Sequence, residues 1–188
     1  MKFHDTPIPG LKVIESEPIV DDRGYFARTF CAREFEQHGL KAIVAQANLA
    51  FNHHKGTVRG MHFQAPPAAE TKLVRCTRGA IQDIVVDLRP ESATFLQHFA
   101  IELTADNQTS LYVPERFAHG YQTLTDAAEV SYQVGEFYTP GFERGLRFND
   151  PQVALPWPIE PTNVSVKDRS WPLLDDAHVA SIRREMSQ

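Results

Sequence analysis

The sequence predicts an all-β protein, an antiparallel sandwich or barrel with helices only at its periphery. Short runs of alternating apolar and polar residues fill the middle of the chain, and each is about as long as one strand. Turn-forming residues separate these runs, at Arg78-Gly79, Arg89-Pro90, Asp106-Asn107, Pro140-Gly141 and Asn149-Asp150-Pro151. Many short strands with turns at this spacing are typical of antiparallel sandwiches and barrels.

Alternation is clearest in residues 80–88 and 95–103. In the first segment Asp83 and Asp87 lie on one face, opposite an apolar face made of Ala80, Ile84, Val86 and Leu88. In the second segment Phe95, Phe99, Ile101 and Leu103 share a face. Further strands are expected at residues 57–64, 72–76, 110–113, 120–124, 129–134 and 145–148.

Helices are expected only near the two ends of the chain. Residues 31–38 have the composition of a short helix that ends at Gly39. Residues 176–186, within a peripheral C-terminal segment at 174–188, place Val179, Ile182 and Met186 at helical spacing. The proline-rich residues 155–161 suit neither element, and we expect an ordered strap because Trp157 is costly to leave in water.

The composition is that of a soluble globular protein, and it excludes several functional classes. The chain has 188 residues, of which 42% are hydrophobic and 23% charged, and its formal net charge is −5. We expect one domain over residues 1–188, no nucleic-acid partner because the chain is mildly acidic, and no membrane span because its apolar runs are short. With only two cysteines, Cys31 and Cys76, and no apolar leader, we expect a cytoplasmic location.

Two histidine segments carry the first candidate functional residues. A strand over residues 57–64 places His62 and Gln64 on one face, and His119 stands in the segment Pro114–Gly120. These segments resemble the two metal-binding motifs of cupin barrels, but two histidines and an amide make a poor site for zinc or iron. We therefore expect no metal, and we interpret the adjacent pair His53-His54 as loop residues.

Three further residues have both an ordinary and a functional interpretation. Lys72 begins a strand on the same face as Val74 and Cys76, so it either reaches solvent at the rim or is used in a site. Tyr132 is ordinarily a core residue, and Asp168, in a charged loop, is ordinarily a solvated carboxylate. The residues alone leave these alternatives open.

Taken together, the motifs resemble those of the nucleotide-sugar 3,5-epimerases, specifically the dTDP-4-dehydrorhamnose 3,5-epimerase family. The resemblance runs from Ile8 to Pro172 and depends on the order and spacing of many short motifs. These are Asp22-Arg23-Gly24-Tyr25-Phe26, Gln46-x-Asn48, Val58-Arg59-Gly60-Met61-His62-Phe63-Gln64, Lys72-Leu73-Val74, Val86-Asp87-Leu88-Arg89, Phe117-Ala118-His119-Gly120, Tyr132, Tyr138, Asn149-Asp150-Pro151, Trp157-Pro158 and Ser165-x-Lys167-Asp168.

The resemblance implies a fold, an assembly and a chemistry. It implies a cupin-type jelly roll, a homodimer, no metal or organic cofactor, and a nucleotide-diphosphate sugar as substrate. By resemblance His62 is the base that removes a proton beside the 4-keto group, and Asp168 orients its imidazole. Tyr132 is then the acid that reprotonates the opposite face, and Lys72 stabilises the enolate oxygen.

The resemblance also implies binding residues, and here the sequence departs from the family pattern. By resemblance the substrate-binding residues are Arg23, Phe26, Arg28, Gln46, Asn48, Arg59, His119 and Tyr138. Arg28 stands where dTDP-specific members carry an acidic residue, and Ala50 stands where the family has serine. Arg59 has the opposite strand parity from His62, so a bulge at Gly60 is needed to turn both side chains into one pocket.

Several alternatives remain open at this point. Within the family, the alternative is an epimerase that acts on a different nucleotide or sugar, or that inverts one carbon only. Outside it, the chain is a metal-dependent cupin or a cupin that binds sugars without catalysis.

Overall fold

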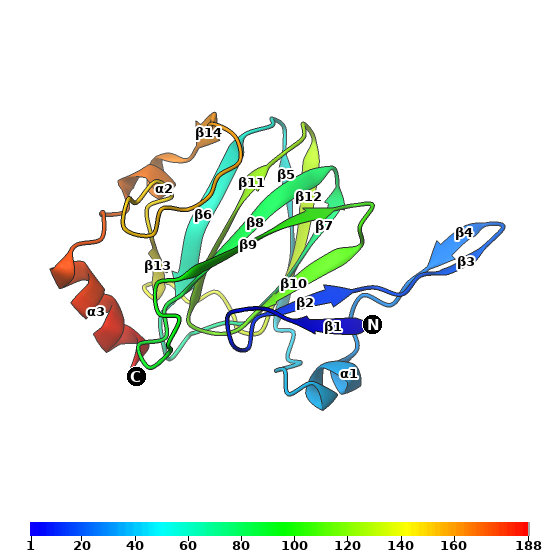
Figure 1. The fold of residues 1–188 in the computed structure, drawn as a ribbon, viewed down its shortest axis with the longest axis horizontal. Helices are drawn as coiled ribbons and strands as arrows, with labels where there is room; N and C mark the ends of the chain where they lie inside the picture. Colours follow the sequence, from blue (N-terminus) through cyan, green and yellow to red (C-terminus); the bar gives the residue numbers. More distant parts are fainter. Residues whose placement is uncertain (188) are drawn as a thin grey trace.

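Two six-stranded sheets packed face to face form the body of the molecule (Figure 1). The computed structural model describes residues 1–187. Apart from one short parallel pair, all strand pairings are antiparallel. The predicted all-β fold class is therefore confirmed.

The strands follow this order across the sheets. The first sheet runs β1 (Lys2–Asp5), β2 (Lys12–Glu15), β10 (Thr109–Val113), β7 (Lys72–Arg78), β12 (Ala128–Val134) and β5 (Gln46–Asn52). The second runs β13 (Glu143–Gly145), β6 (Thr57–Gln64), β11 (Phe117–Thr123), β8 (Ala80–Asp87) and β9 (His98–Thr104), with β14 (Asn163–Val164) parallel to β6. A separate hairpin consists of β3 (Ile19–Asp21) and β4 (Gly24–Phe26).

The main core lies between the two sheets, where strand alternation sends one set of side chains inward. Ile81 and Val85 of β8 meet Val74 of β7 and Val130 of β12 there, and all four are fully buried. The other face of β8 is also buried, with Ile84 and Val86 in a second cluster on the outside of its sheet. A central strand with both faces covered is thus apolar at nearly every position.

Helices cover the outer faces of the sheets (Figure 1). Helix α3 (Asp176–Met186) begins at Asp175, whose side chain accepts a hydrogen bond from the His178 amide, and packs Ile182 and Met186 onto the second sheet. Helix α1 (Ala32–Gln37) packs Phe35 against Tyr112 of the first sheet and ends at Gly39, with φ +71°. A third helix, α2 (Val166–Ser170), lies beside β6.

The predicted proline strap at residues 155–161 has no regular secondary structure and is held in place. The Trp157 indole packs on the outer cluster of the second sheet and donates a hydrogen bond to the Phe148 carbonyl at 2.6 Å. None of the helices among residues 1–187 is long and apolar enough to cross a membrane.

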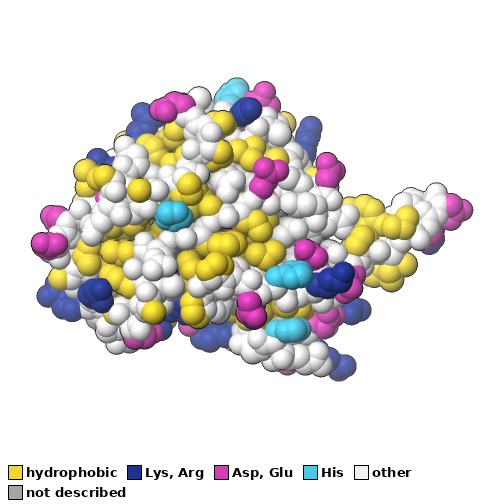
Figure 2. All heavy atoms as spheres, viewed as in Figure 1, with side chains coloured by type: hydrophobic (Ala, Val, Ile, Leu, Met, Phe, Trp, Pro, Cys, Tyr) yellow, Lys and Arg dark blue, Asp and Glu magenta, His cyan; other side chains and the backbone are white. Residues whose placement is uncertain are grey.

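The β3–β4 hairpin projects away from the body as an arm (Figure 1), and it carries apolar side chains near the body and charged ones at its tip (Figure 2). Ile19, Val20, Tyr25 and Phe26 are 58–74% exposed. A two-stranded hairpin has only marginal stability by itself in water. The arm is therefore the part of the chain whose apolar surface most clearly lacks a covering partner.

The structure corrects several details of the sequence interpretation. Strand β9 begins at His98 rather than Phe95, and β13 occupies residues 143–145 rather than 145–148. Of the two interpretations of Asp168, the solvated loop carboxylate is wrong, because the residue lies in α2 and is 3% exposed. Asp83 and Asp87 were expected on a polar face, yet both are fully buried, because Ile81 and Val85 on that same face belong to the inter-sheet core.

Asp87 is stabilised in the core by a dense set of donors. Its carboxylate accepts hydrogen bonds from the Arg89 amide and guanidinium at 2.7–3.0 Å, and from the hydroxyls of Ser92 and Thr94 at 2.7 Å each. Burial opposes ionisation, but the donors, chiefly the Arg89 side chain, outweigh it and lower the pKa of this carboxyl.

We predict that Asp87→Asn lowers the free energy of unfolding by about 2–3 kcal/mol at pH 7, because the charge-assisted bonds are lost. The carboxylate's contribution is fully present above the ordinary carboxyl pKa of about 3.9 and is lost as the pH falls through the lower folded value. Chemical denaturation should therefore show the two proteins converging below about pH 4. Asp106→Asn, at an exposed loop position, is the matched control and should change nothing.

Candidate active site

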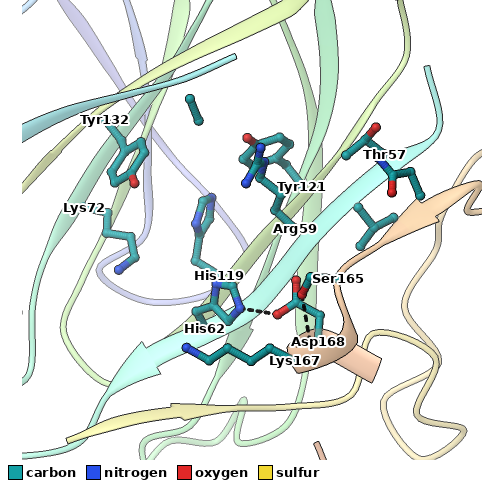
Figure 3. A pocket seen from close by; sticks show the side chains of 13 residues that line it. Thr57, Arg59, His62, Lys72, His119, Tyr121, Tyr132, Ser165, Lys167 and Asp168 are labelled. Carbon is teal, nitrogen blue, oxygen red and sulfur yellow. Dashed lines mark hydrogen bonds and ion pairs between the residues drawn. The ribbon is translucent and has the colours of Figure 1, made fainter. Parts of the chain in front are cut away.

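A cavity of about 470 Å³ opens between the two sheets (Figure 3). Its walls come from both sheets and from the segment that joins β14 to α2. The residues that line it are Ala50, Thr57, Val58, Arg59, His62, Lys72, His119, Tyr121, Tyr132, Asn163, Ser165, Lys167 and Asp168. Six of the twelve residues predicted for the site lie in this wall: His62, Lys72, Tyr132, Asp168, Arg59 and His119.

The strand β6 carries a bulge that places Arg59 and His62 on the same wall. His62 pairs with His119 of β11 and Arg59 pairs with Tyr121, so β6 has one residue more than β11 between these pairs. Gly60 adopts φ +119° there, and a Cβ on it would lie 2.6 Å from the Gly120 Cα. The bulge anticipated at Gly60 is thus present, and glycine is required at its centre.

The His62 imidazole is held by the Asp168 carboxylate. The Nε2 atom of His62 lies 2.5 Å from Oδ1 of Asp168, and the Gly60 amide donates to Oδ2 at 3.3 Å. Burial opposes ionisation of Asp168, but the hydrogen bond and charge of His62 and the bonds from Gly60 and Ser165 outweigh it, so the carboxyl pKa is lowered. An ionised Asp168 accepts a hydrogen bond from Nε2–H of His62, and Nδ1 is then the ring nitrogen left for another partner.

Asp168 reaches this position because a short helix begins directly before it. The Ser165 hydroxyl caps α2 by accepting a hydrogen bond from the Asp168 amide at 3.0 Å. The parallel pairing of β14 with β6 brings the start of α2 against the bulge. The spacing Ser165-x-x-Asp168 is therefore a capping arrangement that also aims a carboxylate at His62.

Lys72 is both paired and turned into the cavity. Its ammonium forms an ion pair with Glu70, whose carboxylate also accepts a hydrogen bond from the Gln64 amide at 3.2 Å. The Lys72 side chain is only 11% exposed, so the interpretation in which it simply reaches solvent does not hold. Glu70 and Gln64 instead keep a cation beside the cavity.

Arg59 and Tyr132 approach the cavity from opposite sheets. The Arg59 guanidinium donates to the Asn52 side-chain oxygen at 2.7 Å, and Asn52 in turn contacts the Tyr121 hydroxyl. Tyr132 stands on β12, in the sheet facing His62 (Figure 3). Burial raises the pKa of Tyr132, with the Arg59 charge opposing it, so the phenol keeps its proton at neutral pH.

A chain of polar contacts continues from Lys167 to Tyr138. Lys167 pairs with Glu143 at 2.5 Å, and the Tyr138 hydroxyl donates to the same carboxylate at 3.3 Å. The Tyr138 ring itself is 58% exposed. Gln46 accepts a hydrogen bond from the Tyr138 amide at 2.9 Å. Tyr138 is therefore connected to the wall residue Lys167 through Glu143, and neither Tyr138 nor Gln46 lines the cavity itself.

Gln46 and Asn48 share a strand face with a wall residue. They alternate with Ala47 and Leu49 on β5, and the next residue of the same parity, Ala50, lines the cavity. Asn48 pairs with Tyr132 of β12 in the sheet. Their face of β5 thus extends the cavity wall along the edge of the first sheet.

Arg23, Phe26 and Arg28 are not brought to the cavity within one chain. Arg23 and Phe26 lie on the arm, where the Arg23 guanidinium pairs with Asp21 and is 86% exposed. Arg28 follows the arm and pairs with Glu34 of α1 at 3.1 Å. Within a single chain Arg23 and Arg28, which the resemblance implies as substrate-binding residues, do not join Arg59 and Lys72 at the cavity.

The sequence interpretation missed several residues of the site. Asn52 and Tyr121 belonged to no motif, because their contact joins positions 69 residues apart in the chain. Lys167 stands in a motif of the resemblance, and Glu70 contacts Gln64 and Lys72 nearby in the chain, but neither had been assigned a role. Among residues 1–187, no three His, Cys, Asp or Glu side chains are grouped so that they could hold a metal ion.

The arrangement is suited to moving protons at a carbon beside a carbonyl. One wall carries an imidazole oriented by a carboxylate, and the opposite sheet carries a protonated phenol. Three cations, Arg59, Lys72 and Lys167, line the same cavity, where they favour negative charge on a bound oxygen. Proton removal on one side and proton return from the other would invert a carbon centre.

Comparisons with known proteins agree with this geometry. A sequence model of the dTDP-4-dehydrorhamnose 3,5-epimerase family matches residues 5–176. The chain is 38% identical to the dTDP-4-dehydrorhamnose 3,5-epimerase of Salmonella typhimurium over 174 residues, 92% of this chain and 94% of the relative.

Solved structures show the same similarity. The dTDP-4-dehydrorhamnose 3,5-epimerase of Bacillus anthracis, with TDP and PPi bound, superposes with a TM-score of 0.89 at 40% identity and covers 92% of this chain and 99% of its own. ChmJ, a 3'-monoepimerase from Streptomyces bikiniensis in complex with dTDP-quinovose, superposes with a TM-score of 0.84 at 29% identity and covers 98% and 100%. The chain has the cupin-type jelly roll of these proteins, is an isomerase, and belongs to the dTDP-4-dehydrorhamnose 3,5-epimerase family.

Proposed function

We propose that the protein converts dTDP-4-dehydro-6-deoxy-D-glucose into dTDP-4-dehydro-L-rhamnose by inverting C3 and C5 without a cofactor. The single observation that carries this proposal is the placement of the His62–Asp168 pair and Tyr132 on opposing sheets of one cavity. A nucleotide sugar is the class of substrate that the related structures contain, since one holds TDP and another dTDP-quinovose.

In this proposal His62 removes the C–H proton beside the 4-keto group. Asp168 accepts a hydrogen bond from Nε2–H of His62, so Nδ1 is the atom that accepts the substrate's proton. The carboxylate then stabilises the imidazolium that forms. The electron pair of the broken C–H bond moves onto the keto oxygen and forms an enolate. Lys72 and Arg59 stabilise the charge that develops on that oxygen.

Tyr132 then donates its phenolic proton to the opposite face of the enolate carbon. Because its hydroxyl is desolvated and protonated at neutral pH, it is available as an acid. The carbon recovers its four bonds in inverted configuration, and solvent restores the proton of Tyr132 and takes that of His62. The 4-keto group lies between C3 and C5, so the same residues serve both carbons in turn.

A second candidate reaction is inversion at C3 alone. The observation that favours it is the similarity to ChmJ, described as a 3'-monoepimerase. The identity of the nucleotide is a separate question, because Arg28 and Ala50 depart from the dTDP pattern and Ala50 lines the cavity. Assaying 4-keto sugars linked to different nucleotides, with NMR of the products, distinguishes these reactions directly.

We also propose that the protein acts as a homodimer in the cytoplasm. The arm exposes four large apolar side chains, and the edge strand β5 exposes Leu49 and Phe51 on the face opposite to the cavity residue Ala50. Arms exchanged between two copies would cover this surface and could carry Arg23 and Phe26 to the partner's cavity. The free thiols of Cys31 and Cys76 support a reducing compartment.

We predict that the protein incorporates solvent deuterium into dTDP-4-dehydro-6-deoxy-D-glucose at C3 and C5, as followed by NMR. His62→Asn should lower the exchange rate by about 10²–10⁴-fold, because no other group replaces the base. Tyr132→Phe should retain exchange on the His62 face while the inverted product falls by a similar factor.

The matched control is His98→Asn, an exposed histidine of β9, which should exchange at the wild-type rate. Exchange at C3 alone would establish the monoepimerase reaction. If the wild-type protein shows no exchange with dTDP-, CDP-, GDP- or UDP-linked 4-keto sugars, the proposed function is wrong. Tight binding of these sugars without exchange would identify a non-catalytic binding protein.

We predict a dimer at micromolar concentration by light scattering, and a monomer after Val20→Asp, because the charge would be buried in the contact of the arm. The monomer should also lose activity if the arm supplies part of the site. Leu173→Asp introduces the same charge between α2 and α3, at the opposite end of the molecule, and should leave the dimer intact (Figure 1). A monomeric wild-type protein would refute this assembly.

A further inference from the structure

Asp83 is a carboxyl group within the inter-sheet core, and the chemistry proposed above does not use it. It lies on β8 between Ile81 and Val85, two fully buried members of the core, and its own exposure is zero. A lone carboxylate in such surroundings costs several kcal/mol. Residues of this kind persist where a specific partner or function retains them.

The partner of Asp83 is His119 of the cavity wall. Oδ1 of Asp83 lies 2.7 Å from Nε2 of His119, and Oδ2 is buried with no hydrogen-bond partner among residues 1–187. The contact is fixed by the sheet, because β8 and β11 are in register and Asp83 is opposite Tyr121, two residues beyond His119. Both ends of the interaction therefore stand on rigid central strands.

The number of protons on the Asp83–His119 pair determines whether His119 can donate a hydrogen bond to a ligand. With one proton the pair carries a net negative charge in the core. With two, one between Nε2 and Oδ1 and one on Nδ1, the pair is neutral overall, and burial favours that form. Burial raises the pKa of the Asp83 carboxyl, with the nearby His119 opposing the shift, which also favours a pair that retains its second proton.

The second ring nitrogen is left for a ligand. Nδ1 of His119 has no hydrogen-bond partner among the described residues, and the ring lines the cavity together with Arg59, Lys72, His62, Tyr121 and Tyr132 (Figure 3). Arg59 and Lys72 alone would disfavour another positive charge beside them. The negative charge of Asp83, 2.7 Å from the ring, offsets theirs.

We propose that Asp83 is a positioning residue that keeps a proton on Nδ1 of His119, so that His119 donates a hydrogen bond to an oxygen of the bound substrate. The identity of that substrate rests on the proposed function, but the protonation of His119 does not. His119 then differs from His62, whose carboxylate partner leaves a basic Nδ1. Two histidine–carboxylate pairs in one cavity would serve opposite purposes, one accepting a proton and one donating a hydrogen bond.

The first test is the ¹⁵N NMR spectrum of histidine-labelled protein without substrate, with His119 assigned through His119→Asn. We expect Nδ1 of His119 to be protonated at pH 7 and Nδ1 of His62 to be unprotonated. An unprotonated Nδ1 on His119 would overturn the proposal, whether or not the protein proves to be an epimerase. This separates its failure from failure of the proposed function.

The second test is a double-mutant cycle on exchange kinetics. Asp83→Asn should lower kcat/KM by about 10- to 100-fold, the size expected when one hydrogen bond to a charged group is weakened. In a His119→Asn background the same change should add less than about 2-fold, because Asp83 acts through His119. An equal loss in both backgrounds would show a purely structural role and would refute the proposal.

Discussion

The contact between Gly60 and Gly120 is the constraint on which the site depends. At this point β6 and β11 approach so closely that a Cβ on Gly60 would lie 2.7 Å from the His119 carbonyl oxygen, and a Cβ on Gly120 would lie 2.8 Å from the Arg59 carbonyl oxygen. Only glycine fits on both strands, and only there does β6 gain its extra residue. Because of this extra residue, the side chains of Arg59 and His62 point to the same face of the sheet, although their positions in the sequence have opposite parity.

The rest of the cavity follows from this local geometry. The bulge turns the Gly60 amide toward Asp168, so one carboxylate binds both the irregular backbone and the imidazole it orients. Lys72 and Tyr132 stand on the uninterrupted part of the β7–β12 pairing in the other sheet, where alternation directs them inward. A rigid sandwich thus holds an oriented imidazole and a buried phenol on opposite walls of one cavity, which Arg59 and Lys72 also line.

Sequence patterns predicted the sandwich, both terminal helices and, through the family resemblance, six of the thirteen residues that line the cavity. They could not show that Asp168 is buried, because its environment is created by β14 and β6, which lie about a hundred residues apart in the chain. Asp83 had a readable signal, since Ile81 and Val85 make its face as apolar as the opposite one. The arm escaped prediction because its apolar surface has no counterpart within the same chain.

The most direct test of this account is the deuterium-exchange rate of Gly60→Ala, measured on folded protein beside Gly39→Ala. Both glycines have positive φ, but a Cβ at Gly39 meets nothing within 4 Å, so that control carries the backbone strain without the clash. The account predicts a loss of about 100-fold or more for Gly60→Ala, because displacing Arg59 and His62 by a fraction of an ångström disrupts the reacting geometry, and a near wild-type rate for Gly39→Ala. Equal rates for the two variants would contradict it.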